Sequence, residues 1–145
     1  MPMRLGSPMP PLEGATGSYN AEGFDPGALA GHPTLVHFWS VSCHICHEVM
    51  DEVLRYRDLY QPKGLRVVAI HMPKEEGDLD TAKVERDIRQ YGITQPVLLD
   101  HRHALAQAFQ NQFVPAFFLF DAQGNLFFRA AGDKGLQNQI GRAHV

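Results

Sequence analysis

Two cysteines separated by two residues, Cys43 and Cys46, are the only cysteines in this 145-residue chain. An apolar run, residues 35–39, precedes them, and a segment with helical periodicity follows. This order predicts a strand, a turn and a helix, with both cysteines in the first helical turn. Unpaired backbone N–H groups and the helix dipole favour a negatively charged sulfur there. Because the thiolate is the nucleophilic form of cysteine, the pair is suited to thiol–disulfide chemistry.

The two cysteines are predicted to have different roles. Cys43 lies at the turn, so its thiolate can attack a disulfide and form a mixed disulfide. Cys46 lies one helical turn further in and can resolve that intermediate by attacking Cys43. The alternatives are an unused dithiol or half of a zinc site. Structural zinc sites use four ligands, and the chain has no second cysteine pair to complete one, so we expect no metal and no cofactor.

Composition and length narrow the class of protein. A chain of 145 residues with 44% hydrophobic residues is long enough for one domain with a real core. It has no apolar run long enough to span a membrane. The net charge of −3, without a basic patch, argues against a nucleic-acid or anionic-membrane binder. Two cysteines are too few for a structural disulfide framework. We expect a monomer.

The N-terminus carries no visible signal peptide, because Met1-Pro-Met-Arg4 is followed by Gly, Ser and Pro rather than an apolar region. The expected compartment is therefore the cytoplasm, or an extracytoplasmic one if a leader is missing from this sequence.

The chain divides by composition into two parts. Residues 1–19 are rich in proline, glycine and serine and predict an extended N-terminal arm, and residues 20–145 predict a single domain. Within this domain the patterns predict strands at 34–39, 65–71, 96–100, 116–121 and 126–131, helices at 43–60, 82–91 and 103–109, and a possible last helix within 132–145. The acidic run at 73–80 is expected to be a solvated surface loop. Alternating strands and helices that end in a hairpin indicate an α/β fold with a mixed sheet.

Two motifs resemble the thioredoxin-like oxidoreductases, and within them the TlpA/ResA type. They are Phe38-Trp-Ser-Val-Ser-Cys43-His-Ile-Cys46 and, far downstream, Phe113-Val-Pro115-Ala-Phe. Three further features point to this type: the Met9-Pro-Pro-Leu-Glu-Gly lead-in, the long insert from 72 to 95 with an extra helix and strand, and Phe120-Asp-Ala-Gln-Gly-Asn. The resemblance covers roughly residues 12–132. It implies a thioredoxin fold, with a central mixed β-sheet flanked by helices and an inserted helix–strand segment.

The same resemblance places the family's redox pair on Cys43 and Cys46 and its cis-proline on Pro115. A cis-proline that faces the cysteines exposes a neighbouring backbone edge, which can pair with an extended substrate segment. Trp39 is expected to pack beside the active-site turn. Together with Val114 and Pro115, it would shape the substrate groove.

His37 and His44 are candidates for proton transfer or for tuning the cysteines. His37 lies six residues before Cys43, where thioredoxin carries a buried acid, and it is expected to be either a base toward Cys46 or a hydrogen-bonded core histidine. A protonated His44 would stabilise the Cys43 thiolate, and the alternative is a solvent-facing residue. Glu48 is a further relay candidate, although the family's acid usually falls one position later, at Val49. His47 is expected to face solvent.

The function predicted from these residues is a thiol-disulfide oxidoreductase that acts on protein or small-molecule thiols and disulfides, together with a partner reductase or oxidase. Two alternatives remain at this point. A Sco-like copper carrier would need a distal histidine such as His71 or His101. A thioredoxin-like peroxidase would place Cys43 in a Thr-x-x-Cys setting, which Ser40-Val-Ser-Cys43 matches loosely.

Overall fold

A six-stranded sheet forms the centre of the described part of the chain, and its strand order is β1-β4-β3-β2-β5-β6. The computed structural model describes residues 3–131, so the predicted last helix lies outside the described residues. Strands β2, β3 and β4 are parallel, and β1, β5 and β6 run antiparallel to their neighbours. The strands are β1 (Gly17–Tyr19), β2 (Thr34–Trp39), β3 (Arg66–His71), β4 (Val97–Leu99), β5 (Ala116–Phe120) and β6 (Leu126–Ala131).

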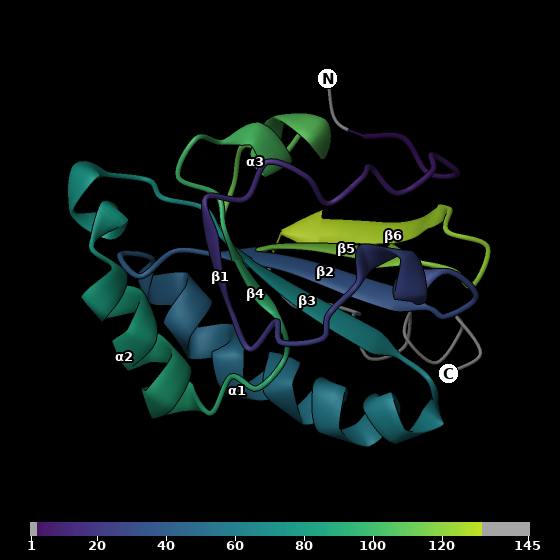
Figure 1. Cartoon of the computed structure of the whole chain (residues 1–145), viewed down its shortest axis with the longest axis horizontal. Coiled ribbons are helices and arrows are strands. Elements are labelled where there is room, and N and C mark those ends of the chain that lie inside the picture. Colours follow the sequence, from purple (N-terminus) through teal and green to yellow (C-terminus); the bar gives the residue numbers. More distant parts are fainter. Residues whose placement is uncertain (1–2, 132–145) are drawn as a thin grey trace.

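Helices cover both faces of this sheet (Figure 1). Helices α1 and α2 lie on one side, and α3 and the N-terminal segment lie on the other. The α-helices are α1 (His44–Tyr60), α2 (Thr81–Tyr91) and α3 (Ala104–Ala108), and short 3-10 turns are η1 (Pro26–Leu29), η2 (Gln61–Lys63) and η3 (Glu76–Leu79). The predicted mixed α/β architecture is confirmed, and the helices and strands expected between residues 34 and 131 form within about two residues of their predicted ends.

Strand β2 carries the redox motif into the middle of the sheet. All six of its residues are buried, because the strand lies between β3 and β5 and is covered on both faces. Its side chains alternate between the two faces. Val36 and Phe38 pack in the core on the α3 side, whereas Leu35 and Trp39 pack against α1. His37 shares the face of Leu35 and Trp39, so the alternation points it toward the helix that bears the cysteines.

Local capping sets the ends of α1 and α2. Cys43 is the extended N-cap residue of α1, and its sulfur accepts the Cys46 N–H. Asp80 caps α2 by accepting the Ala82 N–H. Gly92 ends α2 in the left-handed conformation at a φ of 72°, which glycine adopts without steric cost.

Within the arm expected over residues 1–19, several of the described residues, 3–19, pair with the sheet or pack on its core. Gly17–Tyr19 form the edge strand β1, antiparallel to β4, and Pro8 makes an isolated bridge to Asn125. Met3 is buried in the core on the α3 side. Strand β1 was not predicted, because three residues in a glycine-rich segment carry no period that marks a strand.

The acidic run at 73–80 is not simply a solvated loop. Most of its charged residues are exposed, but Asp78 is only 1% exposed. The expectation of a solvated surface is therefore wrong at this residue, since neighbouring hydroxyl and N–H groups replace the water that the carboxylate loses.

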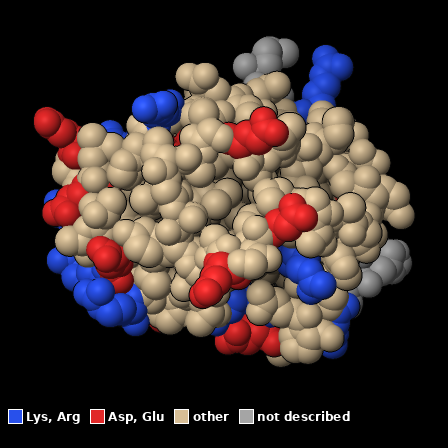
Figure 2. Space-filling view, in the orientation of Figure 1, with Lys and Arg blue, Asp and Glu red and all other residues tan. Residues whose placement is uncertain are grey.

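No helix in the described part of the chain is long and apolar enough to cross a membrane. On the face drawn in Figure 2, acidic and basic side chains are interspersed and do not form one continuous basic patch.

Candidate active site

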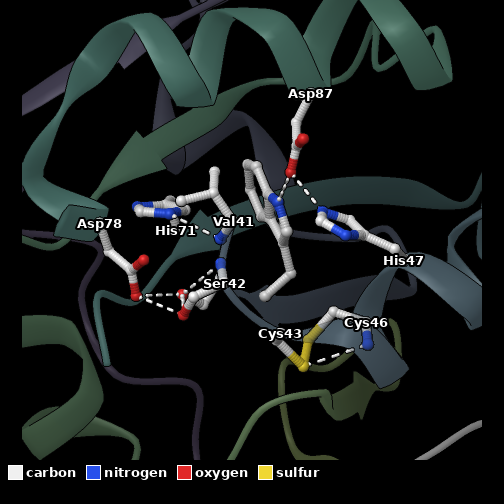
Figure 3. A network of polar contacts seen from close by, with 10 residues as sticks. Val41, Ser42, Cys43, Cys46, His47, His71, Asp78 and Asp87 are labelled. Atoms are coloured by element: carbon white, nitrogen blue, oxygen red, sulfur yellow. Dashed lines mark hydrogen bonds and ion pairs between the residues drawn. A yellow bond between two sulfur atoms is a disulfide. The ribbon is translucent and has the colours of Figure 1, made fainter. Parts of the chain in front are cut away.

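Cys43 and Cys46 are joined in a disulfide at the N-terminus of α1 (Figure 3). The Cys46 backbone N–H donates to Cys43 Sγ at 3.1 Å. Cys46 is 1% exposed, whereas Cys43 is half-buried. One sulfur is therefore open to a partner molecule and sits on a helix N-terminus, while the other is enclosed by protein.

The turn before Cys43 is tied to the insert through Asp78. The Cys43 N–H donates to Ser40 O at 3.1 Å, which closes the turn. Both serine hydroxyls donate to Asp78 Oδ2, Ser40 at 2.6 Å and Ser42 at 2.8 Å. The carboxylate thus contacts the turn at two side chains, one on either side of its tip.

The same Asp78 oxygen also accepts the backbone N–H groups of Lys74 at 2.8 Å and Glu75 at 3.2 Å. Burial by itself would raise the pKa of Asp78, but the bonds from Ser40, Ser42 and these two N–H groups outweigh it and lower the pKa. Asp78 is therefore a buried anion that four donors hold in place.

His71, at the end of β3, also forms a hydrogen bond with this turn. Its Nε2 accepts the Val41 N–H at 3.2 Å. Burial lowers the pKa of His71 to about 4, and the opposing effect of the nearby Asp78 carboxylate is smaller. The ring is therefore neutral near pH 7 and carries its proton on Nδ1, which has no partner among the described residues.

Trp39 and His47 share one acceptor, Asp87 of α2. Figure 3 shows His47 and Asp87 pointing toward each other. Trp39 Nε1 donates to Asp87 Oδ2 at 3.0 Å, and His47 Nε2 lies 2.8 Å from the same oxygen. The His47 ring also stacks on Tyr91, with centroids 5.3 Å apart. The expectation that His47 faces solvent is wrong, because a buried carboxylate and an aromatic ring hold its side chain at 25% exposure.

His37 is buried in a polar chain that sets its tautomer. Arg57 Nη1 donates to Gln95 Oε1 at 2.7 Å, which turns the Gln95 amide nitrogen toward His37 Nε2, 3.0 Å away. The amide donates, so Nε2 accepts and the network assigns the ring proton to Nδ1. Burial, followed by the Arg57 charge, lowers the pKa of His37 to about 4.

A small cavity below the disulfide brings several predicted site residues together. His37, Trp39, Cys46 and Pro115 all line it, and it has room for about one water molecule. The Val114–Pro115 peptide bond is cis, and Val114 packs on the cluster that contains Trp39 and Cys46. The downstream proline is thus adjacent to the enclosed side of the disulfide, although almost 70 residues separate it from Cys46 in sequence.

Two predicted residues are not part of this buried group. His44 Nε2 and Glu48 Oε1 form an ion pair of 2.9 Å on the surface of α1, with side chains 85% and 59% exposed. They are one helical turn apart and contact each other in solvent.

Sequence reasoning missed Asp78, Asp87, Gln95 and both serines of the turn. The one signal for Asp87 was indirect, since a buried tryptophan N–H needs an acceptor somewhere. No sequence pattern distinguished Asp78 from the other charged residues of the acidic run at 73–80.

Within residues 3–131, no three or more histidine, cysteine or acidic side chains form a group that could hold a metal ion. His71, one of the two candidates for the distal histidine of the copper-carrier alternative, instead accepts the Val41 N–H with its Nε2.

The parallel β2-β3-β4 core, the antiparallel hairpin and the dithiol at a helix N-terminus together define the thioredoxin-like class. The family model described as Redoxin matches residues 4–139, and the chain belongs to this family.

Similar proteins agree with this assignment. Thiol-disulfide oxidoreductase YkuV of Bacillus subtilis (strain 168) is 44% identical over 135 residues, which cover 93% of this chain and 90% of that protein. Thiol-disulfide oxidoreductase ResA of Geobacillus thermodenitrificans (strain NG80-2) is 23% identical over 96 residues, 66% of this chain and 52% of ResA. The solution structure of a thioredoxin-like protein in the oxidized form superimposes with a TM-score of 0.88 at 44% identity and covers 97% of both chains.

The relatives and the disulfide at the helix N-terminus identify the activity as thiol–disulfide exchange. The chain is a thiol-disulfide oxidoreductase of the thioredoxin-like, TlpA/ResA-related type, and its substrates are thiols and disulfides.

Proposed function

We propose that Cys43 is the attacking thiol and Cys46 the resolving thiol of a cycle that reduces client disulfides. The Cys43 thiolate attacks one sulfur of the client disulfide, and the other client sulfur leaves as a thiolate. The Cys46 thiolate then attacks Cys43 Sγ and releases the first client sulfur. The client gains two electrons, and the Cys43–Cys46 disulfide forms again. A separate dithiol reductase returns it to the dithiol.

The observation that carries this assignment is the contrast in exposure between the two sulfurs. A client disulfide can reach half-buried Cys43, whereas Cys46 at 1% exposure can reach only its neighbour. The Cys46 N–H and the α1 dipole stabilise negative charge on Cys43. These features favour attack at Cys43 and resolution from Cys46.

The client groove that we propose runs beside Val114 and Pro115, with Trp39 as its floor. Trp39 is 1% exposed, so it contributes shape rather than an open contact. Next to Val114, Phe113 is 66% exposed and offers an apolar contact at the surface. An extended client segment would pair with the backbone at this position.

The sequence suggested His37, His44 and Glu48 as residues that transfer protons or tune the cysteines. The Nε2 lone pair of His37 is already engaged by Gln95, and with a pKa of about 4 the ring is a weak base toward a thiol. We therefore assign His37 a structural role in the wall of the cavity rather than a role as the base that takes a proton from a thiol. His44 and Glu48 pair in solvent, and we assign neither a part in the reaction.

For partners, we retain the expectation of a monomer that exchanges electrons with a separate reductase or oxidase. The cytoplasm and an extracytoplasmic compartment remain the two expected locations.

Reduction of insulin disulfides by the chain, with dithiothreitol as reductant, tests the proposed cycle. We expect turnover with the wild type and background rates with Cys43→Ser. Reduced Cys46→Ser, mixed with insulin after dithiothreitol has been removed, should instead accumulate a mixed disulfide through Cys43, visible by mass spectrometry. A mixed disulfide that forms through position 46 in Cys43→Ser, but not through Cys43 in Cys46→Ser, would reverse the assigned roles.

A further inference from the structure

The insert, residues 72–95, contacts the redox motif through two buried carboxylates. Asp78, in η3, holds the turn that leads into Cys43, and Asp87, in α2, holds Trp39 and His47 (Figure 3). They are 1% and 3% exposed. Most of the other acidic residues of the insert lie at the surface and carry no comparable set of bonds.

We propose that Asp78 is a positioning residue that keeps Cys43 Sγ on the N-terminus of α1 and thereby stabilises its thiolate. This inference rests on the proposed role of Cys43 as the attacking thiol. Asp78 acts through Ser42, which directly precedes Cys43, and through Ser40, whose carbonyl oxygen accepts the Cys43 N–H.

The bonds of the turn show how the effect is transmitted. Cys43 is held at the N-cap by its N–H bond to Ser40 O, and Ser40 is itself held by its hydroxyl bond to Asp78. Ser42, directly before Cys43, has the same anchor. If this anchor is lost, the turn can relax and Cys43 can move away from the Cys46 N–H. The thiolate would then lose a hydrogen bond and the most favourable part of the helix dipole.

The charge of Asp78 would act in the opposite direction. A nearby anion disfavours a thiolate, so removal of the charge alone should lower the pKa of Cys43. In Asp78→Asn, weaker hydrogen bonds to the turn would therefore raise the pKa of Cys43, whereas loss of the charge would lower it. Ser42→Ala removes one bond and leaves the charge, so the two variants separate the effects.

The test measures the alkylation rate of Cys43 by iodoacetamide against pH in the reduced full-length chain. Ser42→Ala, Asp78→Asn and the control Glu76→Gln are compared with the wild type. Glu76→Gln removes one exposed negative charge from the same 3-10 turn. We expect Ser42→Ala and Asp78→Asn to raise the pKa of Cys43, with alkylation at low pH slowed up to about tenfold, equivalent to about one pKa unit. Glu76→Gln should match the wild type.

Two outcomes would overturn the inference. One is a lower Cys43 pKa in Asp78→Asn with an unchanged value in Ser42→Ala, which would assign the effect to charge alone. The other is an unchanged pKa in both variants with a lower melting temperature, which would make Asp78 structural only. If Asp78→Asn does not fold, Ser42→Ala decides alone. Alkylation needs no client disulfide, so a wild type that fails to reduce insulin would refute the proposed function without deciding this test.

Discussion

The two sulfurs of the active site lie in opposite surroundings. Cys43 is half-buried, and His44 and Glu48, which follow it in the chain, pair in solvent. Cys46 borders a small cavity that is also lined by His37 and Trp39 of β2 and by Pro115, which directly precedes β5. The exposed His44–Glu48 pair is therefore the weaker part of this environment, although both residues lie close to the cysteines in sequence.

Solvent screening explains this difference. An exposed ion pair such as His44–Glu48 contributes from about 0 to 1 kcal/mol, because water competes with both partners. A buried donor that loses its acceptor costs about 1–3 kcal/mol. We therefore expect substitutions to matter more on the enclosed side, and the predictions below follow that order.

The largest expected effect is acid destabilisation through His37 and His71. Both have a folded-state pKa of about 4, below the unfolded value of 6.5. Between these values the unfolded chain binds more protons, so stability falls as pH drops from about 6.5 to about 4 and is retained above that range. Each histidine accounts for up to about 3 kcal/mol, at about 1.4 kcal/mol per pKa unit. Urea unfolding at a series of pH values measures the loss.

His37→Leu sharpens this prediction. The variant should lose stability at pH 7, because the Gln95 amide loses its acceptor, but its additional loss between pH 6.5 and 4 should be about half that of the wild type. His44→Gln, which changes an exposed histidine, serves as the control. An acid-induced loss of stability in His37→Leu as large as in the wild type would show that His37 is not the buried titrating group.

Asp87 gives the next largest effect. Asp87→Leu leaves the buried Trp39 N–H without an acceptor and should cost about 1–3 kcal/mol of unfolding free energy. Asp87→Asn keeps an acceptor for Trp39 and should cost less. Trp39 is the only tryptophan, so its emission maximum reports the change directly. Equal losses in both variants would mean that the hydrogen bond to Trp39 contributes little, and Glu85→Gln controls for the lost charge.

A smaller effect is expected on the exposed side, at Phe113. Phe113→Ala should raise the KM for insulin a few-fold, since it removes an apolar contact beside the proposed groove, and leave the reaction with a small aromatic disulfide unchanged. Leu59→Ala, at the far end of α1 and 47% exposed, is the matched control. Equal changes for both substrates would place Phe113 outside the client groove.

The smallest effect is expected from the solvated pair. His44→Gln and Glu48→Gln should each change the insulin reduction rate less than about twofold. A tenfold change from either variant would contradict the contrast between the two sides.

The elements around the cysteines could be predicted because their signals are local. Strand β2 and helices α1 and α2 follow from short apolar and periodic patterns. Cys43 and Cys46 were identified by type and spacing, and the resemblance to a known family pointed to Pro115.

The contacts that complete the site could not be predicted in the same way. Ser40 and Asp78 are 38 residues apart, and Trp39 and Asp87 are 48 apart, so only the folded sheet brings them together. In the sequence, an acidic residue that becomes buried cannot be distinguished from acidic neighbours that stay in solvent. The exposure of His47 was misjudged for the same reason, since its partner comes from α2.

The most direct test of the whole account is the redox equilibrium of Cys43 and Cys46 in glutathione buffers, followed by counting free thiols. We predict one reversible two-electron transition in which both thiols appear and disappear together. We predict a midpoint near −270 mV, about the value of thioredoxin, because the proposed cycle reduces client disulfides. A midpoint near −120 mV, about that of a strong oxidant, would contradict this direction of electron flow. If no buffer produced an intramolecular disulfide, the exchange cycle proposed for this dithiol would be contradicted.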